Sequence, residues 1–288
     1  MPETSYLTVK NFDSERYHSV RPSYPQSLVD KIMAYHDGSC DELIDIGCGT
    51  GISTVLFASH FKHVVGLDPS DSMLNVAKEK FPEMSWANVN GDELVKGGIQ
   101  PESVDMAVGG ESIHWCDLDK VFQQVNQVLK PKGTFAFWFY VQPEFIELSR
   151  EAHDLYVKYC YSDEYMGKYL TAFQRNFFVT FGGKDMVQKL QSYGFKDIEH
   201  EVVNEFTDKG LYTNTKTPAF LMEGTITLND FLQFVKSWSL YTSWTRDHPG
   251  EPDIAEKFVS ELKDACGVKT MDEPLKIEWA TFYYLCRK

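Results

Sequence analysis

Three glycines at alternate positions follow a short apolar run near the start of the chain. The sequence LIDIGCGTG places Gly47, Gly49 and Gly51 after an expected strand, and a helical pattern follows them. Glycine permits positive φ and lets a ligand approach the main chain, while a helix N-terminus offers unpaired N–H groups. A dinucleotide enzyme usually shows GxGxxG instead. The carboxylate of Asp45, within the strand, suits a cationic amino-acid moiety, so we expect these four residues to bind a cofactor.

Acidic side chains also follow the second and third expected strands. Asp68 ends the run VVGLD, where its carboxylate can accept both hydroxyls of a ribose. The next helix carries Met73, which we expect along the face of an adenine, with plain core packing as the alternative. Asp92 and Glu93 follow the third strand in the turn NGDEL, from which they can read the adenine edge. The pattern therefore predicts a nucleoside site beside the glycine loop.

The segment ESIHW follows the fourth expected strand, at the sheet edge where doubly wound proteins bind their ligands. Glu111 is expected on the cofactor side. His114 can donate a hydrogen bond to an acid or remove a proton from a hydroxyl, and it is the candidate catalytic residue through acceptor positioning. Trp115 can form a wall of the transfer path. A histidine bonded to a neighbouring loop and a packed tryptophan are the purely structural alternatives.

Short apolar runs alternate with amphipathic segments over the first half of the chain. Strands are expected at 42–46, 63–67, 86–89, 104–109 and 133–140, and helices at 51–60, 70–80 and 118–129. Such alternation implies right-handed crossovers and a mostly parallel sheet with helices on both faces. Later, the pattern predicts aromatic-rich helical segments over 145–190, a strand from 194, one helix over 228–244 and a last strand over 276–287.

The charge balance limits the class of partner. The chain has 42 Asp plus Glu against 28 Lys plus Arg, a formal net charge of -14, so no overall field favours a phosphate backbone and no nucleic-acid partner is expected. Six cysteines are scattered without CxxC pairs and are interpreted as reduced thiols, and no metal site is expected. Neither a signal sequence nor an apolar run long enough for a membrane span is found, which favours a cytoplasmic location.

Five successive segments resemble the motifs of class I S-adenosylmethionine-dependent methyltransferases: LIDIGCGTG, VVGLDPSDSML, NGDEL, SVDMAVGGESIHW and LKPKGTFAFW. The opening FDSERYHSVRPSYP and the late KSWSLYTSW and KIEWATFYYLCRK extend the likeness to the fungal trans-aconitate methyltransferase family. The resemblance implies an α/β, Rossmann-like fold with a seven-stranded, mostly parallel sheet in the order 3-2-1-4-5-7-6, whose seventh strand is antiparallel. It also implies S-adenosyl-L-methionine as the cofactor.

The chain length suits one large α/β domain with embellishments rather than two equal domains. We expect a single methyltransferase domain over 1–288. The resemblance implies an N-terminal lid at 1–25, and the break in the strand–helix rhythm predicts a helical cap from insertions at 141–190 and 204–275.

Three residues of the lid and cap are expected to bind the acceptor: Tyr17, Arg21 and Trp238. An arginine suits bidentate binding of a carboxylate, which either the acceptor or the cofactor can supply. Arg16 and Arg21 both lie in a stretch expected to be irregular, so periodicity does not decide which of them faces the site. We favour Arg21 because the adjoining Pro22 limits its backbone.

By the same resemblance, the chain is expected to methylate a carboxylate of a small acid, such as a trans-aconitate- or cantharidin-like dicarboxylate, and to release a methyl ester. A carboxylate is ionised at neutral pH, since its reference pKa is about 4, so no general base is needed. Two alternatives stay open. One is a carbon or hydroxyl methyltransferase of a hydrophobic metabolite, with His114 as base. The other is a non-enzymatic S-adenosylmethionine sensor whose cap recruits a protein.

Overall fold

Ten strands form in the residues that the computed structural model describes, which are 12–145, 150–207 and 210–288. Their bounds are β1 (Glu42–Ile46), β2 (His63–Leu67), β3 (Ser85–Ala87), β4 (Val104–Gly110), β5 (Leu129–Phe145), β6 (Lys196–Val203), β7 (Glu205–Thr207), β8 (Gly210–Tyr212), β9 (Met222–Ile226) and β10 (Leu275–Arg287). The expected strands at 42–46 and 63–67 are confirmed to the residue. The fifth strand is much longer than expected.

The main sheet has the order β3-β2-β1-β4-β5-β10-β6, and β9 pairs with the far end of β10. Strands β1 to β5 pair in parallel, whereas β10 runs antiparallel to β5, β6 and β9. This confirms the strand order that the resemblance implied, including the antiparallel seventh strand. Strand β9 is an addition, and β7 pairs with β8 in a separate ribbon.

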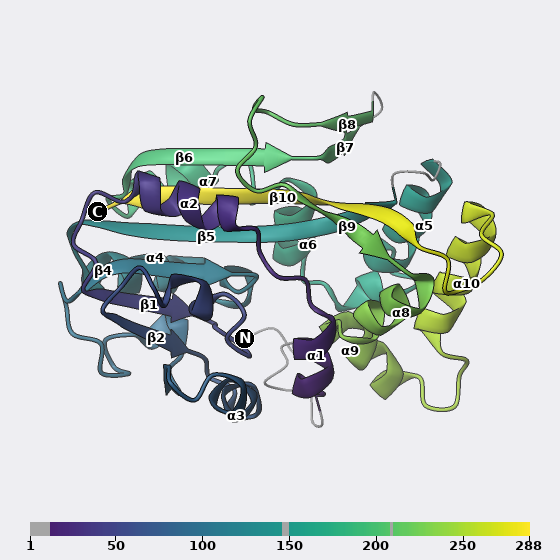
Figure 1. Cartoon of the computed structure of the whole chain (residues 1–288), viewed down its shortest axis with the longest axis horizontal. Coiled ribbons are helices and arrows are strands. Elements are labelled where there is room, and N and C mark those ends of the chain that lie inside the picture. The colour runs from purple at the N-terminus through teal and green to yellow at the C-terminus, as the bar shows by residue number, and fades with distance from the viewer. Residues whose placement is uncertain (1–11, 146–149, 208–209) are drawn as a thin grey trace.

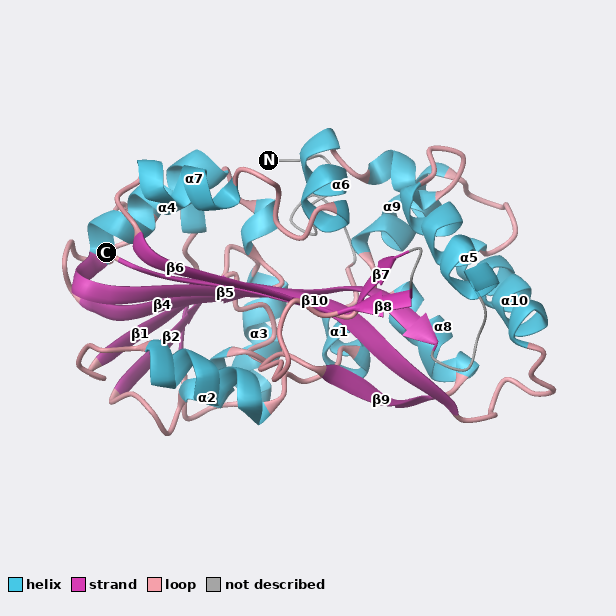
Figure 2. Cartoon of the chain, turned by 90° about the horizontal axis from the view of Figure 1, so that it is seen from above, coloured by secondary structure: helices cyan, strands magenta, loops and turns pink. Residues whose placement is uncertain are grey.

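Helices cover both faces of this sheet. Their bounds are α1 (Ser14–Val20), α2 (Gln26–Tyr35), α3 (Asp71–Lys80), α4 (Leu118–Val128), α5 (Arg150–Tyr161), α6 (Ala172–Val179), α7 (Met186–Ser192), α8 (Leu228–Lys236), α9 (Ser239–Asp247) and α10 (Ile254–Cys266). Figure 2 shows α4 and α7 on one face and α2 on the other. Each face buries its own apolar cluster at helical spacing, with Leu28 and Ile32 in one and Val121 and Val125 in the other. Within the described ranges, no helix combines the length and the apolar character that a membrane crossing requires.

The cap helices gather where β5 and β10 run on beyond the other strands (Figure 1). The segments between β5 and β6 and between β9 and β10 meet there. Tyr159 and Lys158 on α5 both donate to Glu261 on α10, at 2.7 and 2.9 Å. Tyr169, in the 3-10 turn η4 (Met166–Tyr169), donates to Asp247 at the end of α9, at 3.0 Å. Two segments that are far apart in the sequence therefore form one body.

Helix α1 lies between the sheet domain and the cap, in contact with both α3 and α8 (Figure 1). The stretch around Arg16 was expected to be irregular, and that expectation is wrong. Asp13 caps the helix by accepting the Arg16 N–H at 2.9 Å, which satisfies one of the free donors of the first turn. The helix ends at Val20, so Arg21 follows it in an extended conformation.

Two expected helices differ from the structure. Only the 3-10 turn η1 (Thr54–Phe57) forms within 51–60, because Asp45 binds the hydroxyls of Ser53 and Thr54 and so fixes the turn in another conformation. The helix expected over 228–244 breaks between α8 and α9. Ser237 turns its hydroxyl back to the Phe234 carbonyl at 2.6 Å, and the backbone of Trp238 is extended.

A buried carboxylate fastens the amino-terminal end of the sheet. Asp105, whose side chain is 2% exposed, accepts the backbone N–H groups of Asp41 and Glu42 at 3.1 and 2.9 Å. The Ser39 hydroxyl and the Lys130 ammonium donate to it at 2.5 and 2.9 Å. Burial alone would raise the pKa of Asp105, but these hydrogen bonds and the Lys130 charge outweigh burial and hold that pKa below its ordinary value.

We expect Asp105→Asn to lower the free energy of unfolding by about 1.5 to 3 kcal/mol at neutral pH, because it removes charge-assisted hydrogen bonds. A depressed folded-state pKa stabilises the fold above the ordinary carboxyl pKa, near ~4, and this stabilisation is lost as pH falls below it. Urea unfolding of both proteins should therefore show a gap that closes on acidification. Asp41→Asn, which alters an exposed pair with Lys62, is the control and should cost much less. A constant gap across this pH range would contradict the expectation.

Candidate functional site

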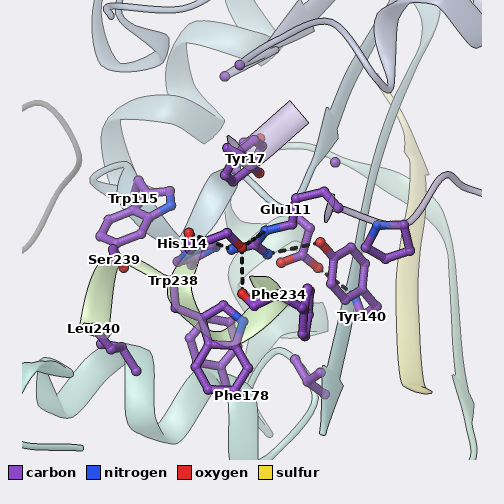
Figure 3. Close-up of a pocket in the computed structure, with 18 of the residues that line it drawn as sticks. Tyr17, Glu111, His114, Trp115, Tyr140, Phe178, Phe234, Trp238, Ser239 and Leu240 are labelled. Atoms are coloured by element: carbon purple, nitrogen blue, oxygen red, sulfur yellow. Dashed lines mark hydrogen bonds between the residues drawn. The ribbon is translucent and has the colours of Figure 1, made fainter. Parts of the chain in front are cut away.

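A cavity opens at the carboxyl ends of β1 and β4, between the sheet and the cap. Its walls come from the loops after these two strands, from the end of α1, from β5 and from the junction of α8 and α9. Figure 3 shows Tyr17, Glu111, His114, Tyr140 and Trp238 around this space. Open α/β sheets bind their ligands at this edge. The cavity is therefore the candidate ligand site.

The glycine loop after β1 contributes main chain to the wall. Gly47, Gly49 and Gly51 have φ values of 68°, 56° and 88°, a region that favours glycine. A Cβ on Gly49 would meet nothing within 4 Å, and Gly49 lines the cavity. A Cβ on Gly51 would instead lie 2.5 Å from the Trp86 ring, and one on Gly47 2.6 Å from Cβ of Ser112. Gly49 thus leaves space for a ligand, whereas the other two glycines permit close packing.

Asp45 lies behind this loop and does not line the cavity. Its Oδ2 accepts the hydroxyls of Ser53 and Thr54 at 2.6 and 2.7 Å. Its Oδ1 is buried with no hydrogen-bond partner among the described residues. Burial raises the pKa of Asp45 to about 6, against the effect of the two hydroxyls. The structure therefore gives Asp45 a role in fastening the loop and does not bring it to the wall where a direct cofactor contact was expected.

Asp68, at the end of β2, is fully buried and holds the loop from the other side. Its Oδ2 accepts the Gly49 N–H at 2.9 Å, and its Oδ1 accepts the Ser70 N–H at 2.8 Å. Asp68 is not part of the cavity wall, but Met73, one turn further on in α3, is. The two hydrogen bonds of Asp68 thus join the glycine loop, β2 and the start of α3.

Asp92 and Glu93 lie in the 3-10 turn η2 (Gly91–Glu93), away from the cavity wall. Asp92 accepts the Asp117 N–H at 3.0 Å. Glu93 is exposed and pairs with Lys96 at 3.0 Å. The structure therefore places Glu93 towards solvent and not on the cavity wall, because a turn read from sequence does not tell which side chain faces inward.

Glu111 lines the cavity from the loop after β4, with a left-handed backbone at φ 55°. Its Oε1 accepts the Tyr140 N–H at 2.5 Å. Burial raises the pKa of Glu111 to about 8, although the Arg21 charge and the Tyr140 N–H oppose this rise. The Glu111 carboxyl is therefore mostly protonated at neutral pH.

Arg21 reaches the same space from the end of α1. It donates to the Tyr140 hydroxyl at 3.0 Å and to the Ser237 hydroxyl and carbonyl at 3.2 and 3.4 Å. Its guanidinium lies over the rings of Tyr17 and Phe234, at 4.6 and 5.3 Å. Burial alone would lower the pKa of Arg21, but Tyr140 and Tyr17 raise it, so the cation persists. No carboxylate of the described chain lies within 4.0 Å of this guanidinium.

His114 lines the cavity within a cluster of aromatic rings. Trp115, Phe178 and Phe139 have ring centroids 4.7, 4.9 and 5.4 Å from the imidazole. Burial, with a smaller contribution from the Arg21 charge, lowers the pKa of His114 to about 3. Its Nδ1 is buried and has no hydrogen-bond partner in the described ranges. The imidazole is therefore neutral at physiological pH.

The comparisons with known proteins agree with this geometry. The methyltransferase domain family matches residues 44–137. A Saccharomyces cerevisiae protein described as "Probable S-adenosylmethionine-dependent methyltransferase CRG1" is 48% identical over 294 residues, which cover 100% of this chain and 99% of that protein. The chain belongs to the S-adenosylmethionine-dependent methyltransferases.

Solved structures show the same fold for this methyltransferase. A protein described as "a Putative Type II Methyltransferase from Anaeromyxobacter dehalogenans" has a TM-score of 0.60 at 21% identity, over 93% of this chain and 97% of its own. Haemonchus contortus phosphoethanolamine N-methyltransferase 2, in complex with S-adenosyl-L-methionine, has a TM-score of 0.53 at 20% identity, over 99% of this chain and 59% of its own. At such identities the likeness establishes the fold alone.

The residues of this methyltransferase fit S-adenosyl-L-methionine on two observations. The open side of Gly49 faces the cavity, so main chain is accessible there without an intervening Cβ. Directly behind the loop, Oδ1 of Asp45 is buried and unpartnered among the described residues, so a cationic group nearby is favourable. Over the described ranges there is no cluster of His, Cys, Asp or Glu that could hold a metal ion.

Several wall residues of the methyltransferase were not expected from the sequence. The structure brings the expected Tyr17, Arg21, Glu111, His114, Trp115 and Trp238 to the cavity together with Tyr140, Gln142, Phe178, Phe234 and Ser237. Strand alternation from buried Trp138 could have found Tyr140, since both lie on one face of β5. The sequence did not indicate Ser237 as a wall residue, because its position depends on a helix break that the hydrophobic periodicity did not show.

We expect Gly49→Ala to weaken S-adenosyl-L-methionine binding by calorimetry while lowering the free energy of unfolding by about 1 to 2 kcal/mol, the cost of a left-handed alanine. Gly51→Ala is the matched comparison, since its Cβ also collides with Trp86 and should destabilise the fold more. Unchanged cofactor affinity in Gly49→Ala would show that the glycine loop does not contact the cofactor.

Proposed function

We propose that this methyltransferase transfers a methyl group to a carboxylate of a small organic acid, such as a trans-aconitate- or cantharidin-like dicarboxylate, and releases a methyl ester. The sequence likeness to trans-aconitate methyltransferases motivates the substrate class. The observation that carries the proposal is Arg21, a half-buried cation on the cavity wall whose hydrogen-bond acceptors are neutral oxygens.

The surroundings of Arg21 favour an anionic ligand. The Arg21 charge is partly withdrawn from water and has no carboxylate of the described chain beside it, so an anion that enters the cavity gains a charge-assisted contact. Tyr140 and Ser237 fix the guanidinium from two sides, and the Tyr17 and Phe234 rings flank it. A planar, prepositioned guanidinium is suited to the two oxygens of a carboxylate.

The neutral His114 favours a carboxylate acceptor over a hydroxyl or carbon acceptor. A hydroxyl must lose a proton during transfer, and a histidine with a pKa of about 3 is a weak base at neutral pH. A carboxylate is already ionised, since its ordinary pKa is about 4. His114 and Trp115 then act by orienting the acceptor against the aromatic wall, with Trp238 closing the cap side.

S-adenosyl-L-methionine supplies an electrophilic methyl group on a sulfonium when bound, so the protein chiefly aligns the two reactants. Gly47 and Gly49 offer main chain to it, and Met73 an apolar face. Asp68 stays the proposed ribose acceptor because it follows β2 at the edge of the sheet where open α/β folds bind nucleosides. Asp92 stays the proposed contact to the adenine edge.

The direct test incubates the protein with labelled S-adenosyl-L-methionine and a panel of small mono- and dicarboxylates, and detects products by mass spectrometry. Methyl esters that form together with S-adenosylhomocysteine are the expected result. Methyl ethers or carbon-methylated products from hydroxyl- or carbon-acid controls, without esters, would overturn the carboxylate proposal.

Arg21→Ala should raise the Michaelis constant of the acid about 10- to 100-fold and change the S-adenosyl-L-methionine dissociation constant much less, because a charge-assisted hydrogen bond to the acid is lost. Lysine should rescue only part of the loss, since it lacks the planar fork. Arg16→Ala is the matched control, because Arg16 lies on α1, the helix that Arg21 follows, and pairs with exposed Asp13. A defect confined to cofactor affinity would show that Arg21 binds the cofactor and not the acceptor.

The pH dependence should be set by Glu111 rather than His114. Glu111 is neutral below its pKa of about 8, and ionisation above that value places a negative charge near Arg21 that opposes an anionic acceptor. We therefore expect kcat/KM for the acid to be flat from about pH 6 to 7.5 and to fall above about 8. Glu111→Gln should remove the fall, and His114→Gln should leave the profile shape intact. A kcat/KM that rises through neutrality would instead indicate a general base.

A further inference from the structure

Strand β5 contains one residue more than its partner where it leaves the sheet domain for the cap. Val141 pairs with Ala280 and Pro143 pairs with Trp279, so Gln142 has no opposite residue in β10. This arrangement is a β-bulge, in which the extra residue interrupts the ladder and turns its side chain away from the regular alternation.

The apolar cluster on the α2 side of the sheet shows which strand carries the extra residue. Ile277 and Tyr283 of β10 both belong to this cluster, so the alternation of β10 is unbroken. In β5 the cluster includes Trp138 and Tyr140, and then Phe145. The residues of β5 that face this cluster therefore change from even-numbered to odd-numbered between Tyr140 and Phe145. Without Gln142, Phe145 would face the opposite side of the sheet.

The backbone of Gln142 is held in an unfavourable conformation. Its φ is 42°, a region that non-glycine residues rarely adopt and that costs free energy. Among the described residues of the cavity wall, Glu111 and Gln142 are the non-glycine residues with positive φ. A glycine would relieve the strain at position 142, so the amide side chain is retained at a cost in stability.

The Gln142 side chain is 8% exposed and lines the cavity beside Tyr156 and Tyr161. The Gln142 amide lies close to the hydroxyl of Tyr161, and that hydroxyl lies close to Tyr156. Burial keeps both tyrosines protonated, since it raises the pKa of each above its ordinary value. This part of the wall therefore presents neutral hydrogen-bonding groups, in contrast to the cation at Arg21.

We propose that Gln142 determines acceptor specificity by donating a hydrogen bond from its amide to an uncharged oxygen of the acid, an ether or carbonyl oxygen, while Arg21 holds the carboxylate. The proposal rests on the function proposed above. The two positions are linked through one strand, because Tyr140, which accepts from Arg21, precedes Gln142 by two residues in β5. The amide is a neutral donor, so it suits an uncharged oxygen of the acid, whereas the charged oxygens suit the Arg21 guanidinium.

The test compares two acids of the same shape, tetrahydropyran-4-carboxylate and cyclohexanecarboxylate, with the full-length wild type and Gln142→Gly. The glycine removes the amide and relaxes the bulge, so thermal unfolding should show a protein at least as stable as wild type. We expect kcat/KM for the ether acid to fall about 3- to 10-fold, mainly through KM, with that of the carbocyclic acid nearly unchanged. Gln142→Asn, whose amide is shorter, should recover little of this discrimination.

Lys132→Gly is the matched control, because Lys132 is exposed, has a φ of 68° and lies in β5 away from the cavity. It should leave the ratio between the two acids unchanged. If Gln142→Gly left the ratio of kcat/KM between the two acids unchanged, whether or not both values fell, the specificity role would be overturned. The proposed function would still stand in that case, provided that methyl esters formed. If the wild type esterified no acid of the wider panel, the proposed function would fail instead.

Discussion

The guanidinium of Arg21 connects the three parts of the molecule that enclose the cavity. Arg21 follows α1, and its hydrogen bonds reach Tyr140 in β5 and Ser237 at the end of α8. The contact to the Ser237 carbonyl is possible because the helix breaks there, since within a continuous helix that carbonyl would accept an N–H of the next turn. Helix α1, strand β5 and the cap are therefore positioned around one half-buried cation, and the aromatic wall forms around it.

Burial sets the charge of the other ionisable groups in this wall. It raises the pKa of Glu111 to about 8 and lowers that of His114 to about 3, so both side chains are mostly neutral at pH 7. The same low-polarity surroundings leave the arginine charged, because its ordinary pKa lies far above neutrality. Arg21 is thus the main source of charge for recognising an acceptor, and the contrast among these three wall groups follows from their intrinsic pKa values.

The sequence predicted the parts of the fold that depend on local pattern. The apolar runs predicted β1 and β2 to the residue, and the glycine spacing predicted the loop that faces the cavity at Gly49. It also predicted Asp45 as a cofactor residue, and the structure places this carboxylate behind the loop, where it accepts the hydroxyls of Ser53 and Thr54. The sequence did not show this contact, because the helical pattern over 51–60 did not predict the turn that makes it. The roles of Ser237 and Gln142 depend on a helix break and a strand bulge, which hydrophobic periodicity does not reveal.

The bulge at Gln142 also explains how one sheet supports both the domain and its cap. Strands β5 and β10 remain paired from one body into the other, so the cap cannot move freely without disturbing this ladder. An extra residue in β5 bends the strand and changes which face its later side chains occupy. Phe145 then packs against Phe231 of α8, with ring centroids 5.1 Å apart, which joins the cap to the apolar cluster of the domain. The same bulge therefore places the strained residue Gln142 on the cavity wall.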